Sequence, residues 1–166
     1  ILRPSICVGP SDGFFERFGS IAQYSPFLPL IGGGKTKFAP IYVGDVAKSI
    51  VKALELNSSK PRIYELGGPK IYSFKELMEI LLIQIKKKRL LVNIPWGLAK
   101  FLSLFFLQAL PGSLKITPDQ IEILKQNNVV SSQYPTLEDF GISGTKIQNI
   151  LPKICLRFRT GGEFNR

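Results

Sequence analysis

The first ten residues restrict the fold of this chain more than any other segment. Residues 1–8 are mainly apolar, with Arg3 as their only charged side chain, and Gly9 and Pro10 follow them. This pattern predicts a buried β-strand that ends in a loop. A strand with apolar side chains on both faces is typical of the interior of a parallel sheet, where strands pair with both of its edges. We therefore expect an α/β fold in which this segment is an internal strand.

Helical patterns alternate with short apolar runs as far as residue 89. Asp12 is a suitable N-cap for a helix over residues 13–24, and Ser73 with Glu76 has the spacing of a capping box. Asp45 is expected to cap a further helix. The buried side of that helix is predicted to carry four apolar residues, Ala47, Ile50, Val51 and Leu54.

The second part of the chain is predicted to be mainly helical. We expect an α/β portion over residues 1–89, a helical lobe over residues 90–156 and a flexible tail over residues 157–166. Only about three strands are apparent, whereas sheets in globular proteins usually have roughly five or six. Further strands are therefore expected from a segment upstream of this chain.

The chain carries a large excess of positive charge. It has 22 Lys and Arg against 12 Asp and Glu, which gives a formal net charge of +10. Such an excess attracts nucleic acids, acidic lipid headgroups and acidic proteins alike, and lysine as an ordinary surface residue explains it equally well. The basic residues do not alternate with aromatic ones as in nucleic-acid-binding motifs, so no nucleic-acid partner is predicted.

The composition excludes several kinds of active site. The chain has no histidine, which removes the commonest general base and the Ser-His and Cys-His nucleophile pairs. Cys7 and Cys155 lie at opposite ends and predict neither a zinc site nor a disulfide framework. No Gly-x-Gly-x-x-Gly fingerprint occurs, and no Tyr-x-x-x-Lys pair occurs. The sequence therefore predicts no catalytic residue and no metal ligand.

Residues 95–110 are the most hydrophobic stretch of the chain. They are shorter than the roughly 20 residues that span a bilayer. Such a helix lies at a membrane interface, contacts an apolar partner or is buried in its own lobe, and the composition leaves these alternatives open. For the exposed alternatives, the predicted contact residues are Trp96, Lys100, Phe101 and Phe105.

Several short motifs belong to one pattern. They are ILRPSICVGP at residues 1–10, FAPIYVGDVA at residues 38–47, and YELGGP followed by YSFKEL at residues 64–77. Together they resemble elements of the extended and atypical short-chain dehydrogenases, the NAD-dependent epimerase/dehydratase superfamily. SDGFFERF at residues 11–18 and LEDFGI at residues 137–142 are similar to the family of the 39-kDa accessory subunit of NADH:ubiquinone oxidoreductase and its bacterial relatives.

This resemblance implies the C-terminal part of a Rossmann-type NAD(P)-binding fold with a mainly helical C-terminal lobe. In that family the segment after Arg-Pro passes the nicotinamide end of the cofactor, mainly through backbone contacts. The matching positions in this chain are Pro4, Ser5, Ile6 and Cys7. The family's phosphate-binding loop has no counterpart here, which implies NAD(P)H binding by the intact protein and weak or no binding by this part.

The resemblance also implies a function. It points to a noncatalytic accessory subunit of respiratory complex I, with a structural or assembly role at the membrane. The implied partners are subunits of the respiratory complex and an anionic membrane surface. The implied location is peripheral, on the cytoplasmic face of a bacterial inner membrane or on the mitochondrial matrix side. The alternative is part of an NAD(P)-dependent epimerase or reductase that acts on a nucleotide-sugar, isoprenoid or quinone-linked substrate.

Overall fold

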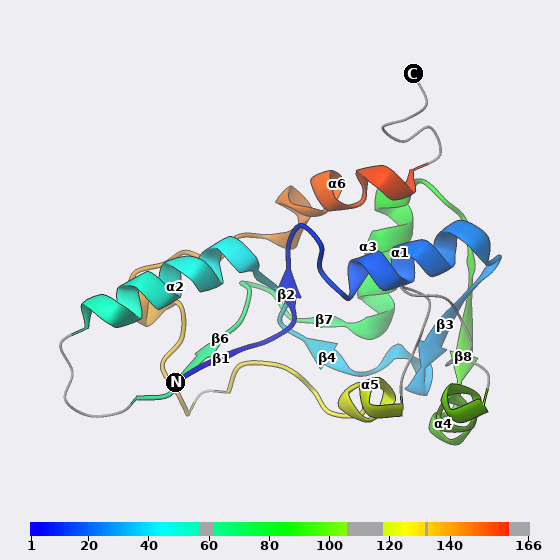
Figure 1. Cartoon of the computed structure of the whole chain (residues 1–166), viewed down its shortest axis with the longest axis horizontal. Coiled ribbons are helices and arrows are strands. Elements are labelled where there is room, and N and C mark those ends of the chain that lie inside the picture. The colour runs from blue at the N-terminus through cyan, green and yellow to red at the C-terminus, as the bar shows by residue number, and fades with distance from the viewer. Residues whose placement is uncertain (57–61, 106–117, 132, 160–166) are drawn as a thin grey trace.

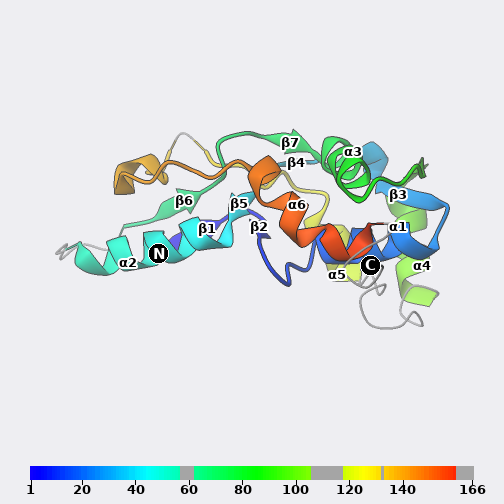
Figure 2. The same cartoon turned by 90° about the horizontal axis from the view of Figure 1, so that it is seen from above.

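The chain is elongated in the computed structural model, which describes residues 1–56, 62–105, 118–131 and 133–159 (Figures 1 and 2). One end holds a pair of short strands beneath a single helix. The other end holds a larger cluster of helices around a second pair of strands. The N-terminal segment runs between the two ends, so its residues contribute to both.

The N-terminal segment forms two short strands rather than one. β1 (Leu2–Pro4) pairs in parallel with β6 (Tyr64–Leu66), and β2 (Cys7–Val8) pairs in parallel with β5 (Ile41–Tyr42). This parallel pairing agrees with the expected α/β class. Each strand has one neighbour among the described residues, where the sequence predicted two.

The longest strand pair lies at the other end of the molecule. β3 (Phe27–Ile31) and β8 (Leu90–Ile94) are parallel along their whole length. Nearby, β4 (Lys37–Phe38) pairs antiparallel with β7 (Tyr72–Ser73). The β3–β8 pair connects the predicted α/β portion with the predicted helical lobe, and the division at residue 89 stays a prediction.

Helix α1 (Phe15–Tyr24) begins close to where the sequence predicts. Oδ1 of Asp12 accepts hydrogen bonds from the backbone amides of Phe14 at 3.0 Å and Phe15 at 2.6 Å. The N-cap position itself is Phe14, so Asp12 does not cap α1 as predicted but binds the amides of the turn that leads into the helix. Burial raises the pKa of Asp12 to about 6, and its Oδ2 atom has no hydrogen-bond partner among the described residues.

Helix α3 (Phe74–Ile85) begins with the predicted capping box. Ser73 Oγ accepts a hydrogen bond from the Glu76 amide, and the Glu76 carboxylate accepts one from the Ser73 amide. The buried side of this helix carries Phe74, Leu77, Met78, Leu81 and Ile85.

Aromatic rings join α1 to α3. The Phe14 ring lies 5.2 Å from the Phe18 ring and 5.9 Å from the Phe74 ring, in edge-to-face geometry, and it lies 6.0 Å from the ring of Phe38. Such pairs stabilise a core by about 0.5–1.5 kcal/mol each beyond their buried area. The cluster therefore fixes the start of α1 over the start of α3.

Helix α2 (Val43–Glu55) differs from the prediction in two respects. Asp45 is not the N-cap, because the helix begins two residues earlier, and its buried side chain lies in the first turn. The side predicted to be buried is exposed: Ile50 is 48 % exposed, Val51 56 % and Leu54 81 %, and Ala47 is exposed as well.

The helix α2 instead packs through the neighbouring side of its surface. Val46 and Ala53 contact a small core that includes Ile41, Tyr64 and Leu66 of the parallel strands. That core is narrow, so it covers one side of the helix only. The apolar stripe of α2, which we define as Ala47, Ile50, Val51 and Leu54, has no covering element among the described residues.

The C-terminal part begins with α4 (Trp96–Phe105) and α5 (Pro118–Ile123), which contact each other. Residues 106–110 of the predicted helix lie outside the described residues. Among the described residues, no helix is both long enough and apolar enough to cross a membrane.

The last described residues return to α1 and α3 through α6 (Leu151–Ile154) (Figure 2). Phe158 is buried beside Gly19 of α1, and Arg159 Nε donates a hydrogen bond of 2.8 Å to the carbonyl of Gln84. Residues 157–159 of the predicted tail are therefore packed on the core.

Candidate functional site

The four residues predicted to face a cofactor lie where the N-terminal segment stops pairing with β6 and begins to pair with β5. Pro4 ends β1, Cys7 begins β2, and Ser5 and Ile6 connect the two strands. The Ser5 amide still donates to a carbonyl of β6, whereas the carbonyl of Ile6 accepts from the amide of Ile41 in β5. The backbone is therefore held from two strands at this point.

Ser5 is fixed by its side chain as well. Its hydroxyl donates to the carbonyl of Asn128 at 2.7 Å and accepts from the amide of Ala39 at 3.2 Å. The residue is 7 % exposed. Because both hydrogen bonds are to the backbone of other segments, this hydroxyl ties three parts of the chain together. Its geometry suits a structural role rather than nucleophilic attack.

Neither cysteine is activated. Cys7 lies at the surface, with Sγ 3.8 Å from the carbonyl oxygen of Ser5, and desolvation raises the pKa of its thiol. Cys155 is fully buried, and burial raises the pKa of its thiol to about 11. Both thiols are therefore protonated at neutral pH, and the thiolate is the form that reacts.

A small polar hollow of about 100 Å³ lies on one side of the β1–β2 junction. Arg3, Pro4 and Ser5 line it together with Glu65 and Asn128. The Glu65 carboxylate accepts a 2.7 Å hydrogen bond from the Ser131 amide, and this bond lowers the pKa of Glu65. The hollow is much smaller than the roughly 300–1,000 Å³ of a typical ligand site, so it holds a few polar atoms at most.

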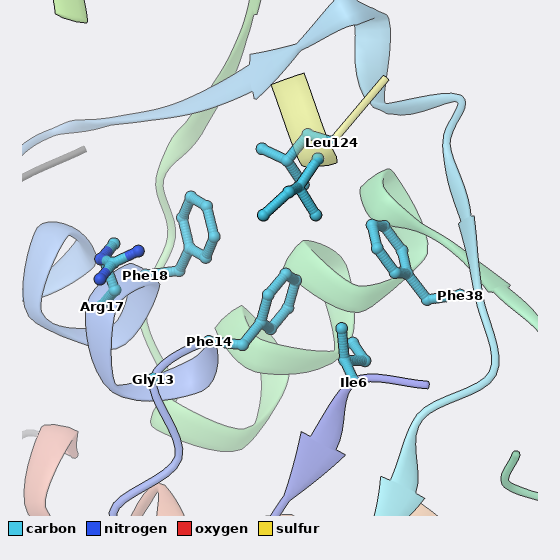
Figure 3. Close-up of a pocket in the computed structure, with 8 residues that line it drawn as sticks. Ile6, Gly13, Phe14, Arg17, Phe18, Phe38 and Leu124 are labelled. Atoms are coloured by element: carbon cyan, nitrogen blue, oxygen red, sulfur yellow. The ribbon is translucent and has the colours of Figure 1, made fainter. Parts of the chain in front are cut away.

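A larger apolar pocket of about 240 Å³ lies beside Ile6 (Figure 3). The side chains of Ile6, Phe14, Phe18, Phe38 and Leu124 converge on it, and Arg17 of α1 stands at its edge. We call this cavity the Ile6 pocket. Of the residues predicted to face a cofactor, Ile6 is the one that lines it.

The sequence did not predict the Ile6 pocket. Helical spacing predicted Phe14 and Phe18 on one side of a helix. The helix α1 begins one residue after Phe14, and both side chains line the pocket. Phe38 and Leu124 come from distant segments, and Thr36 Oγ1 donates to the Leu124 carbonyl at 2.5 Å and so joins these segments. No local signal predicts such a long-range contact.

The residues predicted to face a membrane or a partner lie on α4, apart from the β1–β2 junction (Figure 1). Trp96 is half-buried, and its ring lies against the backbone of Gly32. Lys100 is exposed and Phe101 is 53 % exposed. The side chain of Phe105 lies outside the described residues.

The curated relatives of the chain include three subunits of NADH dehydrogenase or NADH-ubiquinone oxidoreductase. The chain is 34 % identical to NADH dehydrogenase [ubiquinone] 1 alpha subcomplex subunit 9, mitochondrial, of Arabidopsis thaliana, over 98 % of this chain and 42 % of that protein. It is 27 % identical to the Dictyostelium discoideum protein of the same name, over 99 % of this chain and 46 % of that protein. The Neurospora crassa NADH-ubiquinone oxidoreductase 40 kDa subunit is 25 % identical, over 99 % of this chain and 43 % of that subunit. The chain thus spans less than half the length of these relatives.

Solved structures agree on the fold. An NAD-dependent NDP-hexosamine 5,6-dehydratase of tunicamycin biosynthesis superimposes with a TM-score of 0.59 at 17 % identity, over 95 % of this chain and 44 % of that one. A dTDP-glucose 4,6-dehydratase from Bacillus anthracis in complex with NAD gives a TM-score of 0.60 at 14 % identity, over 93 % and 42 %. No protein-family model matches the chain. The expected fold, part of a Rossmann-type NAD(P)-binding fold, is confirmed.

Proposed function

Because this chain belongs to the family of NADH dehydrogenase [ubiquinone] 1 alpha subcomplex subunit 9, the 39-kDa accessory subunit, we propose that it serves as part of such a subunit in respiratory complex I. The observation that carries the proposal is the similarity to these relatives along nearly the whole chain. The partners are then the other subunits of the complex, and the role is structural or in assembly.

We assign NAD(P)H binding to the intact protein rather than to this chain alone. The β1–β2 junction supplies a rigid wall of Pro4, Ser5, Ile6 and Cys7, because backbone hydrogen bonds hold it from both sides. A rigid wall of this kind suits the nicotinamide end of a cofactor. The amides that bind a pyrophosphate belong to a glycine-rich strand–turn–helix unit, and the sequence contains no such motif.

We further propose that the chain does not catalyse a reaction. The sequence has no histidine, the hydroxyl of Ser5 is engaged by two backbone groups, and both thiols have raised pKa values. The lining of the Ile6 pocket also argues against the alternative of a nucleotide-sugar enzyme. Apart from Arg17 at the edge, its walls offer carbon atoms where a sugar nucleotide needs several hydrogen-bond partners.

The membrane-facing side is proposed to be the region around α4. Exposed apolar side chains lie on α4 and α5, which contact each other, namely Leu98 and Phe101 on α4 and Ile123 on α5. With the net charge of +10, this composition suits a peripheral contact with an anionic bilayer. The relatives are named as mitochondrial proteins, so we place the contact on the matrix side or on the equivalent bacterial face.

The test is genetic and biochemical. The gene is disrupted in the organism that encodes it, and membranes are resolved on native gels stained for NADH dehydrogenase activity. We expect less assembled complex I and an unchanged turnover for each complex that remains. A tagged copy of the whole gene should comigrate with the complex and restore its amount. An unchanged amount of complex, together with a tagged protein that migrates elsewhere, would contradict the proposal.

A further inference from the structure

The Ile6 pocket has a chemical feature that the proposed accessory role does not use. Its walls are aromatic and aliphatic, yet Arg17 also lines it. The Nε atom of Arg17 is buried and has no hydrogen-bond partner among the described residues. A buried donor without an acceptor is costly, because the water that it lost has not been replaced. A small movement of this side chain toward a ligand atom that accepts a hydrogen bond would remove this cost.

The neighbouring charges do not satisfy Arg17. Glu16, the adjacent acid on α1, pairs with Arg157 at 2.5 Å. Oδ1 of Asp12, before the start of the same helix, is engaged by the amides of Phe14 and Phe15. Oδ2 of Asp12 is also buried without a partner among the described residues, and it forms no hydrogen bond with Arg17. Burial also lowers the pKa of the Arg17 guanidinium, and a bound anion would stabilise its charged form. An anionic acceptor therefore suits this guanidinium better than a neutral one.

The volume of the pocket sets the size of the ligand. At about 240 Å³ it exceeds the roughly 150 Å³ engineered cavity that holds benzene. It is smaller than the roughly 300–1,000 Å³ sites that hold drug-sized molecules, so a dinucleotide does not fit.

We propose that the Ile6 pocket binds a small amphiphile, an apolar chain of medium length with an acidic end group that meets Arg17. The chain contacts Phe14, Phe18 and Phe38, and the acidic group accepts a hydrogen bond from the guanidinium. Carboxylates and phosphate monoesters share this chemistry. The proposal does not depend on NAD(P)H binding or on membership of a respiratory complex.

Calorimetric titration of the whole chain with decanoate, decyl phosphate and decanol tests this assignment. We expect saturable binding of at least one of the two anions at one site per chain. Arg17→Met should weaken that binding by about tenfold or more and change decanol binding less than twofold, since a hydrogen bond to a charged group contributes at this level. Lys146→Met, which removes an exposed charge outside the pocket, is the matched control and should leave the affinities for all three probes unchanged.

A blocking variant keeps the proposal falsifiable if Arg17→Met perturbs the fold. Gly13 lines the pocket, and a Cβ atom added there meets no other atom within 4 Å. Gly13→Leu should therefore abolish binding of every probe while the near-ultraviolet circular dichroism stays unchanged. Binding that survives Gly13→Leu, an equal loss in Lys146→Met, or the absence of saturable anion binding would each overturn the proposal. Comparison of decanoate with decyl phosphate identifies the end group.

Discussion

The carboxylate of Asp45 accepts a 2.7 Å hydrogen bond from the backbone amide of Thr145, one hundred residues further along the chain. Asp45 is fully buried, and Lys48 contacts its other oxygen at 3.2 Å. Burial alone would raise the pKa of Asp45, but the bonds to Thr145 and Lys48 outweigh it and lower the pKa. The Asp45 side chain therefore links α2 to the segment around Thr145 by a hydrogen bond.

Asp45→Ala should destabilise the chain by about 1–3 kcal/mol, because it leaves the Thr145 amide without its acceptor. Urea unfolding measures the change. Lys48→Met is the control, and it should cost less than about 1 kcal/mol because the Lys48 side chain is 65 % exposed. The lowered pKa of Asp45 means that its contribution is present above its unfolded pKa and is lost as the pH falls. Equal effects of the two substitutions would contradict this account.

Asp12 should have the opposite pH dependence. Its pKa is raised to about 6 in the folded chain, against about 3.9 in an unfolded one. The folded state therefore favours the protonated form, and this stabilisation is complete below pH 4 and is lost as the pH rises through 6. Asp12→Asn keeps an acceptor for the helix start but cannot ionise. The stability of Asp12→Asn relative to the natural chain should rise by about 2–3 kcal/mol between pH 4 and pH 8. A difference independent of pH would show that Asp12 has an ordinary pKa.

Gly32 and Gly97 offer a matched pair of glycine substitutions near α4. Gly32 has a φ of +62°, and a Cβ atom there would collide with the ring of Trp96. A Cβ atom at Gly97 meets nothing within 4 Å. Gly32→Ala should lower the free energy of unfolding by about 1–3 kcal/mol, whereas Gly97→Ala, inside a helix, should raise it by up to about 1 kcal/mol. The fluorescence of Trp96, the single tryptophan, should shift in Gly32→Ala alone.

The chain alone should bind NADPH weakly. Titration followed by nucleotide fluorescence should give a Kd above about 100 µM, because the helix N-terminus that usually holds a pyrophosphate has no motif in this sequence. Ser5→Ala serves as a check on any weak binding, since it loosens the junction at Pro4–Cys7 without removing a charge. Micromolar affinity would contradict the placement of the phosphate site outside this chain.

The chain should sediment with anionic vesicles at low salt and less so at high salt. The combined substitution of Lys100→Glu and Phe101→Ser should reduce the bound fraction several-fold, since one basic residue near the surface contributes about 1 kcal/mol. Ile83→Ser removes an equally exposed apolar side chain from α3 and should have little effect, because Ile83, 72 % exposed, lies on a different helix. No sedimentation at either salt concentration would rule out the membrane role of α4.

Interactions within a few residues were predictable, and those between distant segments were not. Asp12 binds the amides at the start of α1 and Ser73 forms a capping box with Glu76, because both sets of hydrogen bonds close within four residues of the chain. The bond from Asp45 to Thr145 and the convergence of Phe38 with Leu124 depend on how distant segments cross. Sequence spacing contains no information on such crossings.

In the candidate site, too, features of one continuous segment were predictable and contacts between distant residues were not. The family resemblance identified residues 4–7 as one continuous segment, and the structure holds them as a rigid junction. Its use by a cofactor stays a prediction. The unpaired donor of Arg17 could not be predicted from the sequence, because a hydrogen-bond donor is known to lack a partner only once the positions of its neighbours are known.

The apolar stripe of α2 has a consequence for the life of the protein in a cell. Chaperones and proteases sort chains by the apolar surface that they expose, and surfaces of this kind shorten the survival of an unassembled chain. Leu54, Val51 and Ile50 offer such a surface until another element covers them. The survival of this chain should therefore depend on whatever covers α2, whether that is the rest of a longer protein or a separate partner, and chains in which the stripe stays uncovered should be cleared.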